Sequence, residues 1–293
     1  MFQLHATFES KNLMSDELLE QIDQVIQKRP IYKEALSVYR DLMIFLNEIE
    51  PEIKYVIKDG VLHDIKVKEG FSVFSREDLP VDLKAVPSLF QSLLEHLSSR
   101  KRKDKKPLEK ALNTSQADPN WIKNVITAFL SGDETTIVSI AEEVNLEPMV
   151  LKFLAHMASK PSLITLKESV GERIQKDTWD YGCCPLCGSC PDMAYLDKEG
   201  KRFLHCELCG YEWYYPRLKC AFCENNEPKE LGCFVSEEKE GFRVDFCKKW
   251  NRYIKTSDMR IIDLPAPLEL ENLITLHLDM LAHDEQVFKT PYS

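Results

Sequence analysis

The chain has 293 residues, enough for about two domains, and 44% of them are hydrophobic, as in an ordinary globular protein. A net charge of −10 disfavours a general nucleic-acid binder, because such a protein needs a positive field to meet phosphates. The sequence has no apolar run of about 18 residues, and its start has no basic stretch followed by an apolar one. We therefore expect no membrane insertion and no secretory signal, and we predict a cytoplasmic protein.

Roughly the first 170 residues are predicted to be mainly helical. Residues 16–28 follow Ser15, a suitable cap residue, and carry apolar side chains near helical spacing until Pro30 ends the pattern. Residues 31–50 form a second amphipathic segment. Its apolar face consists of Ala35, Leu36, Tyr39, Leu42, Met43 and Leu46. Residues 55–74 are left as irregular structure or a short strand.

Four further helices are predicted, and together they indicate a bundle. Their ranges are 87–97, 119–130, 136–144 and 148–159. The clearest start is Asp118 followed by Pro119, because a cap residue then precedes a proline at the first helical position. Short connections between such helices are typical of a helical bundle, which we assign to residues 1–175. The basic segment 100–106 is interpreted as a solvated linker or helix end, with a patch for an anionic partner as the alternative.

The cysteines divide the chain in two. All ten lie between Cys183 and Cys247, and none lies before them. A cytosolic protein keeps its thiols reduced, so clustered cysteines there are more often metal ligands than disulfides. Residues 180–260 are therefore predicted to form two consecutive metal-ribbon units.

The same region is predicted to be rich in β-structure. Helical periodicity vanishes, and short aromatic and β-branched runs alternate with turn sequences at 198–201 and 239–241. Helical character returns in residues 265–285. The predicted fold class is thus multidomain: a mainly α N-terminal helical bundle, a small β-rich zinc-ribbon module, and a terminal helix.

Two CxxC pairs predict a first metal site. They are Cys184–Cys187 and Cys206–Cys209, with 18 residues between them and a glycine after each. Two thiolates three positions apart bind one ion from a tight turn, and the glycine lets backbone amides turn towards the sulfurs. An intervening hairpin brings the second pair to the other side of the ion. The spacing is typical of a structural four-cysteine site.

A second site is less complete. Cys220 and Cys223 form a third pair, and Cys247 follows after 23 residues. A fourth pair would end at Trp250, whose side chain does not ligate metals, so three thiolates remain. The alternatives for the fourth ligand are Cys233, Asp245 and water. A metal-free ribbon packed by Trp250 and Phe246 is a further alternative.

Two cysteines and one histidine are left over. Cys183 is interpreted as a partly buried, inert thiol, with a redox-active or capturing thiol as the alternative. Cys190 lies three positions after Cys187 and offers an alternative pairing. His205, beside Cys206, is interpreted as a surface residue of a strand, and tuning or ligating the metal are its alternatives.

The order of these motifs resembles the formate dehydrogenase accessory protein FdhE family. The segments that carry the resemblance are CPLCGSCPDM, RFLHCELCGYEW, RLKCAFCEN and DFCKKWNRYIK. Weaker echoes are KRPIYKEALSVYRDLMIFL and EPMVLKFLAHMASKPSL in the helical region. The resemblance covers most of the chain, but only the cysteine region is specific. In that family, four CxxC pairs build two rubredoxin-like ribbons behind a helical domain.

The resemblance implies a cytoplasmic maturation factor, not an enzyme, that binds the catalytic subunit of formate dehydrogenase. It implies iron in rubredoxin-like sites, while the residues themselves suit iron or zinc, with one or two ions per chain. By position, the implied ligands are Cys184, Cys187, Cys206, Cys209, Cys220, Cys223 and Cys247. The chain departs from the family pattern at Trp250, where the family has a cysteine.

Two other functions are weighed against this one. A rubredoxin-like iron redox protein is the first, because four thiolates hold iron in either oxidation state without a change of ligands. A zinc-ribbon nucleic-acid binder is the second, but acidic residues surround the lysines and arginines of the ribbons. No nucleophile with a base, phosphate loop or set of catalytic carboxylates stands out in the sequence.

Overall fold

The structure is a computed structural model that describes residues 4–8, 16–49, 53–57, 67, 69–100, 105–171, 174, 179–235, 241–262 and 266–284. The chain divides into two compact units. The first comprises residues 1–14, 38–61 and 74–169, and the second comprises 15–37, 62–73 and 170–293. The predicted fold class, helices plus a β-rich cysteine module, is confirmed. The predicted domains, 1–175, 180–260 and 265–285, stay a prediction.

The first unit is mainly helical. Its helices are α2 (Lys33–Ile49, from residue 38 on), α4 (Ala85–Ser99), α5 (Lys106–Ala117), α6 (Pro119–Ser131), α7 (Glu134–Val144) and α8 (Pro148–Val170). An antiparallel pair of strands, β1 (Leu4–Phe8) and β2 (Ile53–Ile57), accompanies them. The predicted apolar face of α2 is buried except for Ala35. None of the described helices is both long and apolar enough to cross a membrane.

Local capping sets the boundaries of α6 and α7. The Asp118 carboxylate accepts a hydrogen bond from the Asn120 amide at 2.9 Å, as the cap residue before Pro119 should. Between the two helices Gly132 adopts a φ of 76°, a left-handed conformation that favours glycine. Asp133 then caps α7 by accepting a hydrogen bond from the Thr136 amide at 3.0 Å. The gap between the predicted helices 119–130 and 136–144 is therefore present, and the structure narrows it to Gly132 and Asp133.

Two helices of this unit differ from the prediction. The helix predicted over 148–159 continues to Val170 as α8, with Pro161 inside it. Buried Leu163 and Leu166 extend the packed face beyond the proline, and the Thr165 hydroxyl donates to the Pro161 carbonyl at 2.8 Å. Helix α5 was not predicted, because the lysines before it favoured a linker.

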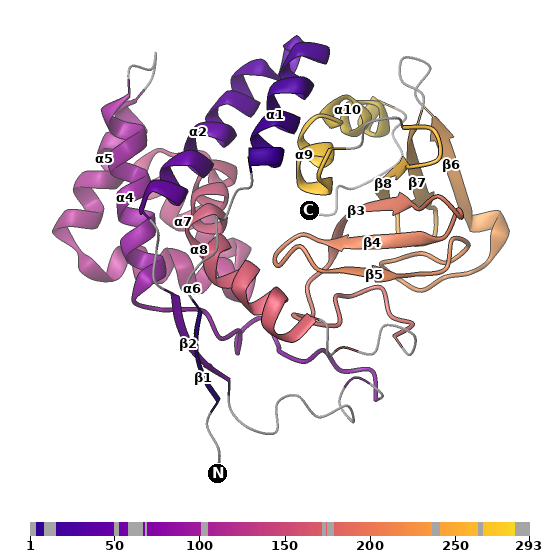
Figure 1. The fold of residues 1–293 in the computed structure, drawn as a ribbon, viewed down its shortest axis with the longest axis horizontal. Coiled ribbons are helices and arrows are strands. Elements are labelled where there is room, and N and C mark those ends of the chain that lie inside the picture. Colours follow the sequence, from indigo (N-terminus) through magenta and orange to yellow (C-terminus); the bar gives the residue numbers. More distant parts are fainter. Residues whose placement is uncertain are drawn as a thin grey trace. The chain divides into compact units, whose positions relative to one another are not determined.

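The second unit is built on one six-stranded sheet. Its strands are β3 (Pro191–Leu196), β4 (Arg202–Cys206), β5 (Glu212–Tyr214), β6 (Leu231–Val235), β7 (Phe242–Cys247) and β8 (Arg252–Asp258), and their order is β5-β4-β3-β8-β7-β6 (Figure 1). Each consecutive set of three pairs antiparallel, and the parallel pair β3–β8 joins the two sets. The two predicted ribbons are therefore halves of a single sheet.

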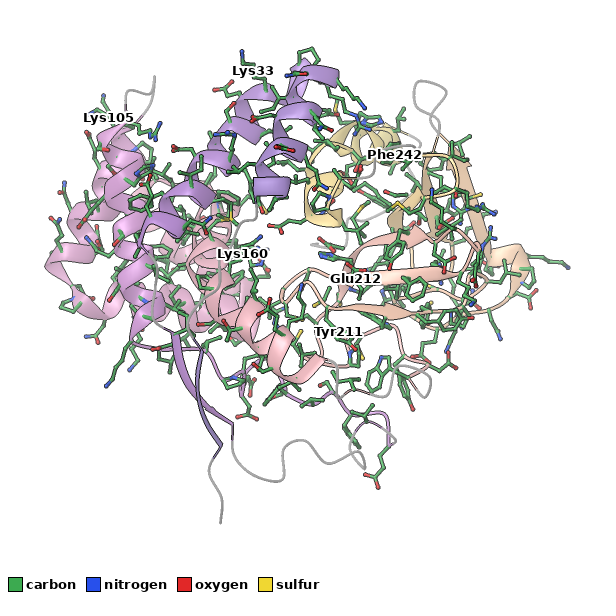
Figure 2. The ribbon with its side chains drawn as sticks, viewed as in Figure 1. Lys33, Lys105, Lys160, Tyr211, Glu212 and Phe242 are labelled. Atoms are coloured by element: carbon green, nitrogen blue, oxygen red, sulfur yellow. The ribbon has the colours of Figure 1, made fainter. Side chains whose placement is uncertain are left out.

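Short helices complete this unit. They are α1 (Asp16–Lys28), η1 (Pro30–Tyr32), η4 (Pro228–Glu230), α9 (Leu268–Leu273) and α10 (Leu276–Asp284). The single C-terminal helix predicted over 265–285 is thus two helices in the described residues. Phe242, labelled in Figure 2, packs in a buried cluster with Leu278 and Ala282 of α10. Burial of this apolar surface holds α10 against the sheet.

A buried polar network also ties the C-terminal helices to the sheet. Lys255 of β8 donates to the Asp279 carboxylate and to the Asn272 carbonyl, at 2.7 and 2.8 Å. The Tyr253 hydroxyl donates to the other Asp279 oxygen at 2.7 Å. The Asn272 amide then donates to Asp192 of β3 at 3.1 Å. Every charge in the network has a partner, as burial requires.

Candidate metal centres

The four cysteine motifs share one backbone turn. In each, the residue after the motif has a positive φ: Gly188 (71°), Gly210 (65°), Glu224 (58°) and Asn251 (55°). In the first three, its amide donates to the carbonyl of the first cysteine, at 2.9, 3.1 and 3.0 Å respectively. In the fourth, the Trp250 amide donates to the Cys247 sulfur and helps to lower the pKa of that thiol against the raising effect of burial. The turn that starts at Cys247 therefore has the same backbone conformation as the others, although its last residue is Trp250 and not a cysteine.

The first two turns bring four cysteines together. Cys184 and Cys187 lie in the loop before β3. Cys206 is the last residue of β4, and Cys209 lies in the turn between β4 and β5. Their sulfur atoms all lie within 4.8 Å of one another. The distances are 3.7 Å from Cys184 to Cys209 and 3.4 Å from Cys187 to Cys206. All four side chains are buried, so this four-sulfur cluster is shielded from water.

Burial shapes the acid–base chemistry of this cluster. It raises the pKa of the Cys184 and Cys206 thiols well above the usual value, and contact with the other sulfur atoms adds to the effect at Cys206. Four thiolates in one buried space repel one another and lack solvation. A bound cation removes both costs, which is why such clusters suit a metal ion.

The other two turns bring three cysteines together. The sulfurs of Cys220, Cys223 and Cys247 lie within 4.8 Å of one another, with 3.7 Å between Cys223 and Cys247. Burial raises the pKa of Cys220 to about 12. The Asn225 side-chain amide donates to the Cys247 sulfur at 3.8 Å. Sequence reasoning missed Asn225, because nothing in its local pattern marks it as a sulfur contact.

Two residues that the sequence analysis linked to the second site, Cys233 and Trp250, lie outside this three-sulfur cluster. Cys233 is exposed on β6, opposite Asp245 of β7, and the structure does not bring it to the three sulfurs. Its assignment as a fourth ligand stays a prediction. Trp250 is 54% exposed. It therefore does not act as the packing centre of a metal-free ribbon.

The leftover residues have structural surroundings. Cys183 is half-buried, and burial raises the pKa of its thiol, which disfavours a reactive thiolate. His205 is not a surface residue, since its side chain is only 12% exposed and its Nδ1 lies 2.7 Å from Asp192. Tyr211, labelled in Figure 2, is buried and donates to the Gly171 carbonyl at 3.2 Å. It and the equally buried Trp213 pack the ribbon.

The two donor sets suit metal ions to different degrees. Four cysteine sulfurs are a complete ligand set for tetrahedral zinc or iron. Three sulfurs leave one position for another ligand. Both clusters are thus consistent with metal binding, and the first is complete within the chain.

The cysteine region is similar in sequence to known proteins. Residues 183–217 match the family described as FdhE, central domain. A protein FdhE homolog of Aquifex aeolicus is 33% identical over 158 residues, which cover 53% of this chain and 55% of that protein. One from Pseudomonas aeruginosa is 35% identical over 119 residues, covering 37% of this chain and 38% of that protein. The chain thus spans about half the length, or less, of these curated relatives.

The fold has a known counterpart as well. The crystal structure of the FdhE protein from Pseudomonas aeruginosa matches with a TM-score of 0.72 and 20% identity. The match covers 99% of this chain and 96% of that one, so the fold is shared over its length. Together these similarities agree with what the cysteine motifs predicted: residues 183–217 match the FdhE central domain, and the chain is similar to FdhE proteins in sequence over about half its length and in fold over nearly all of it.

Proposed function

We propose that this chain is an accessory protein for the maturation of formate dehydrogenase. It acts in the cytoplasm by binding the catalytic subunit and is not itself an enzyme. The observation that carries the proposal is the buried four-sulfur cluster. Its two turns have a positive φ after the cysteine motif, and the same feature recurs in the two turns of the second cluster. The four-sulfur cluster lies inside residues 183–217, the segment that matches the FdhE central domain.

We further propose which residues hold metal. Cys184, Cys187, Cys206 and Cys209 form the first site, and Cys220, Cys223 and Cys247 contribute to the second. Each site takes iron or zinc, giving one or two ions per chain. Either metal supplies a cross-link between turns, and iron in addition supplies a change of oxidation state.

The position of the first site explains what such a cross-link does. It would join the loop before β3 to the turn between β4 and β5, two segments at the same end of the sheet. Backbone hydrogen bonds prepare this arrangement: the Cys184 amide donates to the Ser189 carbonyl at 2.8 Å, and the Cys206 amide donates to the Tyr211 carbonyl at 2.9 Å. The ribbon surface that meets a partner therefore depends on the site being intact.

The test is direct binding. The full chain, purified without oxygen, is mixed with purified, unassembled catalytic subunit of formate dehydrogenase, and complex formation is measured by size-exclusion chromatography. We expect a complex with the wild-type chain and with Cys233→Ser, and none with Cys206→Ser. Failure of the wild-type, metal-loaded chain to bind the subunit would refute the proposed partner.

A further inference from the structure

A pocket of about 210 Å³ lies beside the three-sulfur cluster in the second unit. Cys220 and Cys247 form part of its wall, as do strands β6, β7 and β8. Five of its lining residues are cationic: Arg202, Arg217, Lys219, Arg243 and Arg252. Asp245 is the one carboxylate among the lining residues. This is an unusual wall for a protein whose net charge is −10.

Arg202 is the most telling of these residues. It is 3% exposed, yet within the described part of the chain it forms no ion pair. One guanidinium nitrogen donates to the Pro216 and Lys219 carbonyls, and the group lies 5.2 Å from the centre of the Tyr215 ring. Its Nε is buried without a hydrogen-bond partner among the described residues. A buried charge is ordinarily matched by an opposite one, so Arg202 indicates a missing anion.

Burial lowers the pKa of the Arg202 guanidinium, and the Asp245 charge opposes this only from a distance, since no ion pair among the described residues joins the two. One Asp245 oxygen lies 3.0 Å from the Arg243 Nε. The other accepts from the same guanidinium at 3.2 Å and from the Thr256 hydroxyl at 2.7 Å. Because both oxygens are engaged on Arg243 and Thr256, the carboxylate is held away from direct pairing with Arg202.

The metal site does not cancel the charge either. Lys219 is set aside, since it lies 3.3 Å from Asp180 and 3.8 Å from Glu224. Arg252 is set aside too, since it has interactions of its own, among them the Phe222 ring 5.4 Å away. Arg202, Arg217 and Arg243 less Asp245 then leave two positive charges on the wall. A divalent ion on three thiolates carries one negative charge, so about one positive charge remains in the pocket, enough for one carboxylate.

The remaining residues of the pocket wall and the pocket volume indicate which kind of molecule carries the anion. Apolar side chains make up much of it: Leu218, Phe222, Leu231, Phe246 and Ile254. The volume lies below the roughly 300 Å³ at which pockets for drug-sized ligands begin, so a nucleotide is too large. A planar guanidinium matches a carboxylate with two parallel hydrogen bonds.

We propose that this pocket binds a carboxylate carried on a short apolar body. The carboxylate belongs either to a free small organic acid or to the end of a polypeptide chain, since both present the same chemistry. The pocket borders the second metal site through Cys220 and Cys247, and its proposed ligand does not depend on the proposed formate dehydrogenase interaction.

The first experiment measures ligand binding by calorimetry on the full, metal-loaded chain. Hexanoate is the probe, hexanamide has the same body without the charge, and inorganic phosphate has charge without the body. We expect hexanoate to bind more tightly than either. Arg217→Gln should weaken binding about tenfold, as expected for the loss of a hydrogen bond to a charged group. Arg217 suits the test because it is exposed and has no partner in the described residues, so its loss leaves the fold intact.

The control is Lys201→Gln, which removes the same charge from the same unit outside the pocket. Among the described residues Lys201 forms an ion pair only with exposed Glu199, so we expect no change in hexanoate affinity. Equal weakening by both substitutions would show a general charge effect and overturn the proposal. Binding of phosphate as tight as that of hexanoate would overturn it too.

A second experiment separates the two sources of the carboxylate. A short peptide ending in leucine is compared as the free acid and as the C-terminal amide, again with wild-type and Arg217→Gln chains. Arginine-dependent binding of the free-acid peptide alone would assign the pocket to a polypeptide terminus. Binding of hexanoate but not of the peptide would assign it to a small acid. If neither binds, the proposal is wrong.

Discussion

The two cysteine clusters use the same backbone but differ in what they present to a metal. Each is built from two turns with a positive φ after the motif. The first offers four buried sulfurs, whereas the second offers three, with Trp250 exposed at the position of the missing one. The shape of a ligand turn therefore persists without its ligand. Turn geometry is set by local hydrogen bonds and φ angles, and the number of ligands is decided separately by side chains.

The two clusters also differ in how deeply their cysteine side chains are buried. All four side chains of the first are buried, while Cys223 of the second is half-buried and Cys220 and Cys247 border a pocket. A closed ligand set is typical of a structural site, and a site with an open position exchanges its ligands more readily. We therefore expect the first site to support the fold and the second to hold its ion less tightly.

The largest effect is expected when the closed cluster is broken. Cys206→Ser removes one of four ligands, and metal-binding energy in such a module is folding energy, so the unfolding free energy should fall by several kcal/mol. Metal content and thermal unfolding measure this. Cys233→Ser is the matched control, because this exposed thiol lies outside both clusters. Equal stability of the two variants would contradict the first assignment.

A chelator should remove the metal ions from the two clusters one after the other. A chelator added in stages is expected to strip the three-sulfur site first, because its fourth position is open to competing ligands. The four-sulfur site should then lose its ion together with the folded structure of the ribbon. Elemental analysis and circular dichroism on the same samples follow both events. Simultaneous loss of both ions at the lowest chelator concentration would remove the distinction.

Supplying the missing ligand should make the clusters alike. The turn that ends at position 250 already has the shape of the others, so Trp250→Cys places a thiolate where the pattern expects one. This added ligand should raise the metal affinity by more than the roughly 100-fold effect of residues that only contact the ligands. Competition with a metal indicator measures it. Trp250→Ser is the control, and an equal gain there would show that removal of the indole, not addition of sulfur, is responsible.

A smaller effect is expected at the amide that contacts the second cluster. Asn225→Ala removes the hydrogen bond to the Cys247 sulfur and should weaken metal binding there by about 10- to 100-fold. Asn226, the exposed neighbour, provides the control Asn226→Ala. Only the first substitution should alter the affinity, and neither should alter the four-sulfur site.

The smallest effect is expected at a helix cap in the helical unit, which contains neither cluster. Hydrogen bonds from the Thr136 hydroxyl and then from its amide lower the pKa of Asp133 below its usual value. A carboxylate with a lowered folded-state pKa stabilises the fold above its unfolded-state pKa, and that stability is lost as pH falls through the folded-state pKa. Asp133→Ala should therefore lower the melting temperature slightly at neutral pH and have less effect in acid. Metal content should not change, and Asp133→Asn should keep most of the cap.

Sequence reasoning succeeded where the signal is local. The first cluster follows from spacing and from the glycines at 188 and 210, which mark their turns. The predicted cap at Asp118 has the same character, because it acts within three residues of the chain. The cap at Asp133 was not predicted, and its helix begins two residues earlier than expected. Glu224 takes the same left-handed conformation although glutamate rarely adopts it, and Asn251 takes it with a residue type that adopts it more often. The equivalence of all four turns therefore appeared only in three dimensions.

Features that depend on distant parts of the chain were missed. Strand β8 pairs in parallel with β3 some 60 residues earlier, and no local pattern signals that pairing. Helix α8 passes through Pro161 because buried residues beyond it outweigh one lost backbone hydrogen bond. The cationic pocket draws Arg202 from β4 and Arg243 from β7, so no single segment of sequence displays it.

The measurement that tests the central claim most directly is metal content per chain, by elemental analysis with a visible spectrum, on anaerobically purified wild-type and Cys206→Ser protein. The account predicts that the wild-type chain carries one ion more than the variant, and that this ion is iron or zinc held by Cys184, Cys187, Cys206 and Cys209. A wild-type chain without metal, or equal metal content in the two proteins, would contradict it.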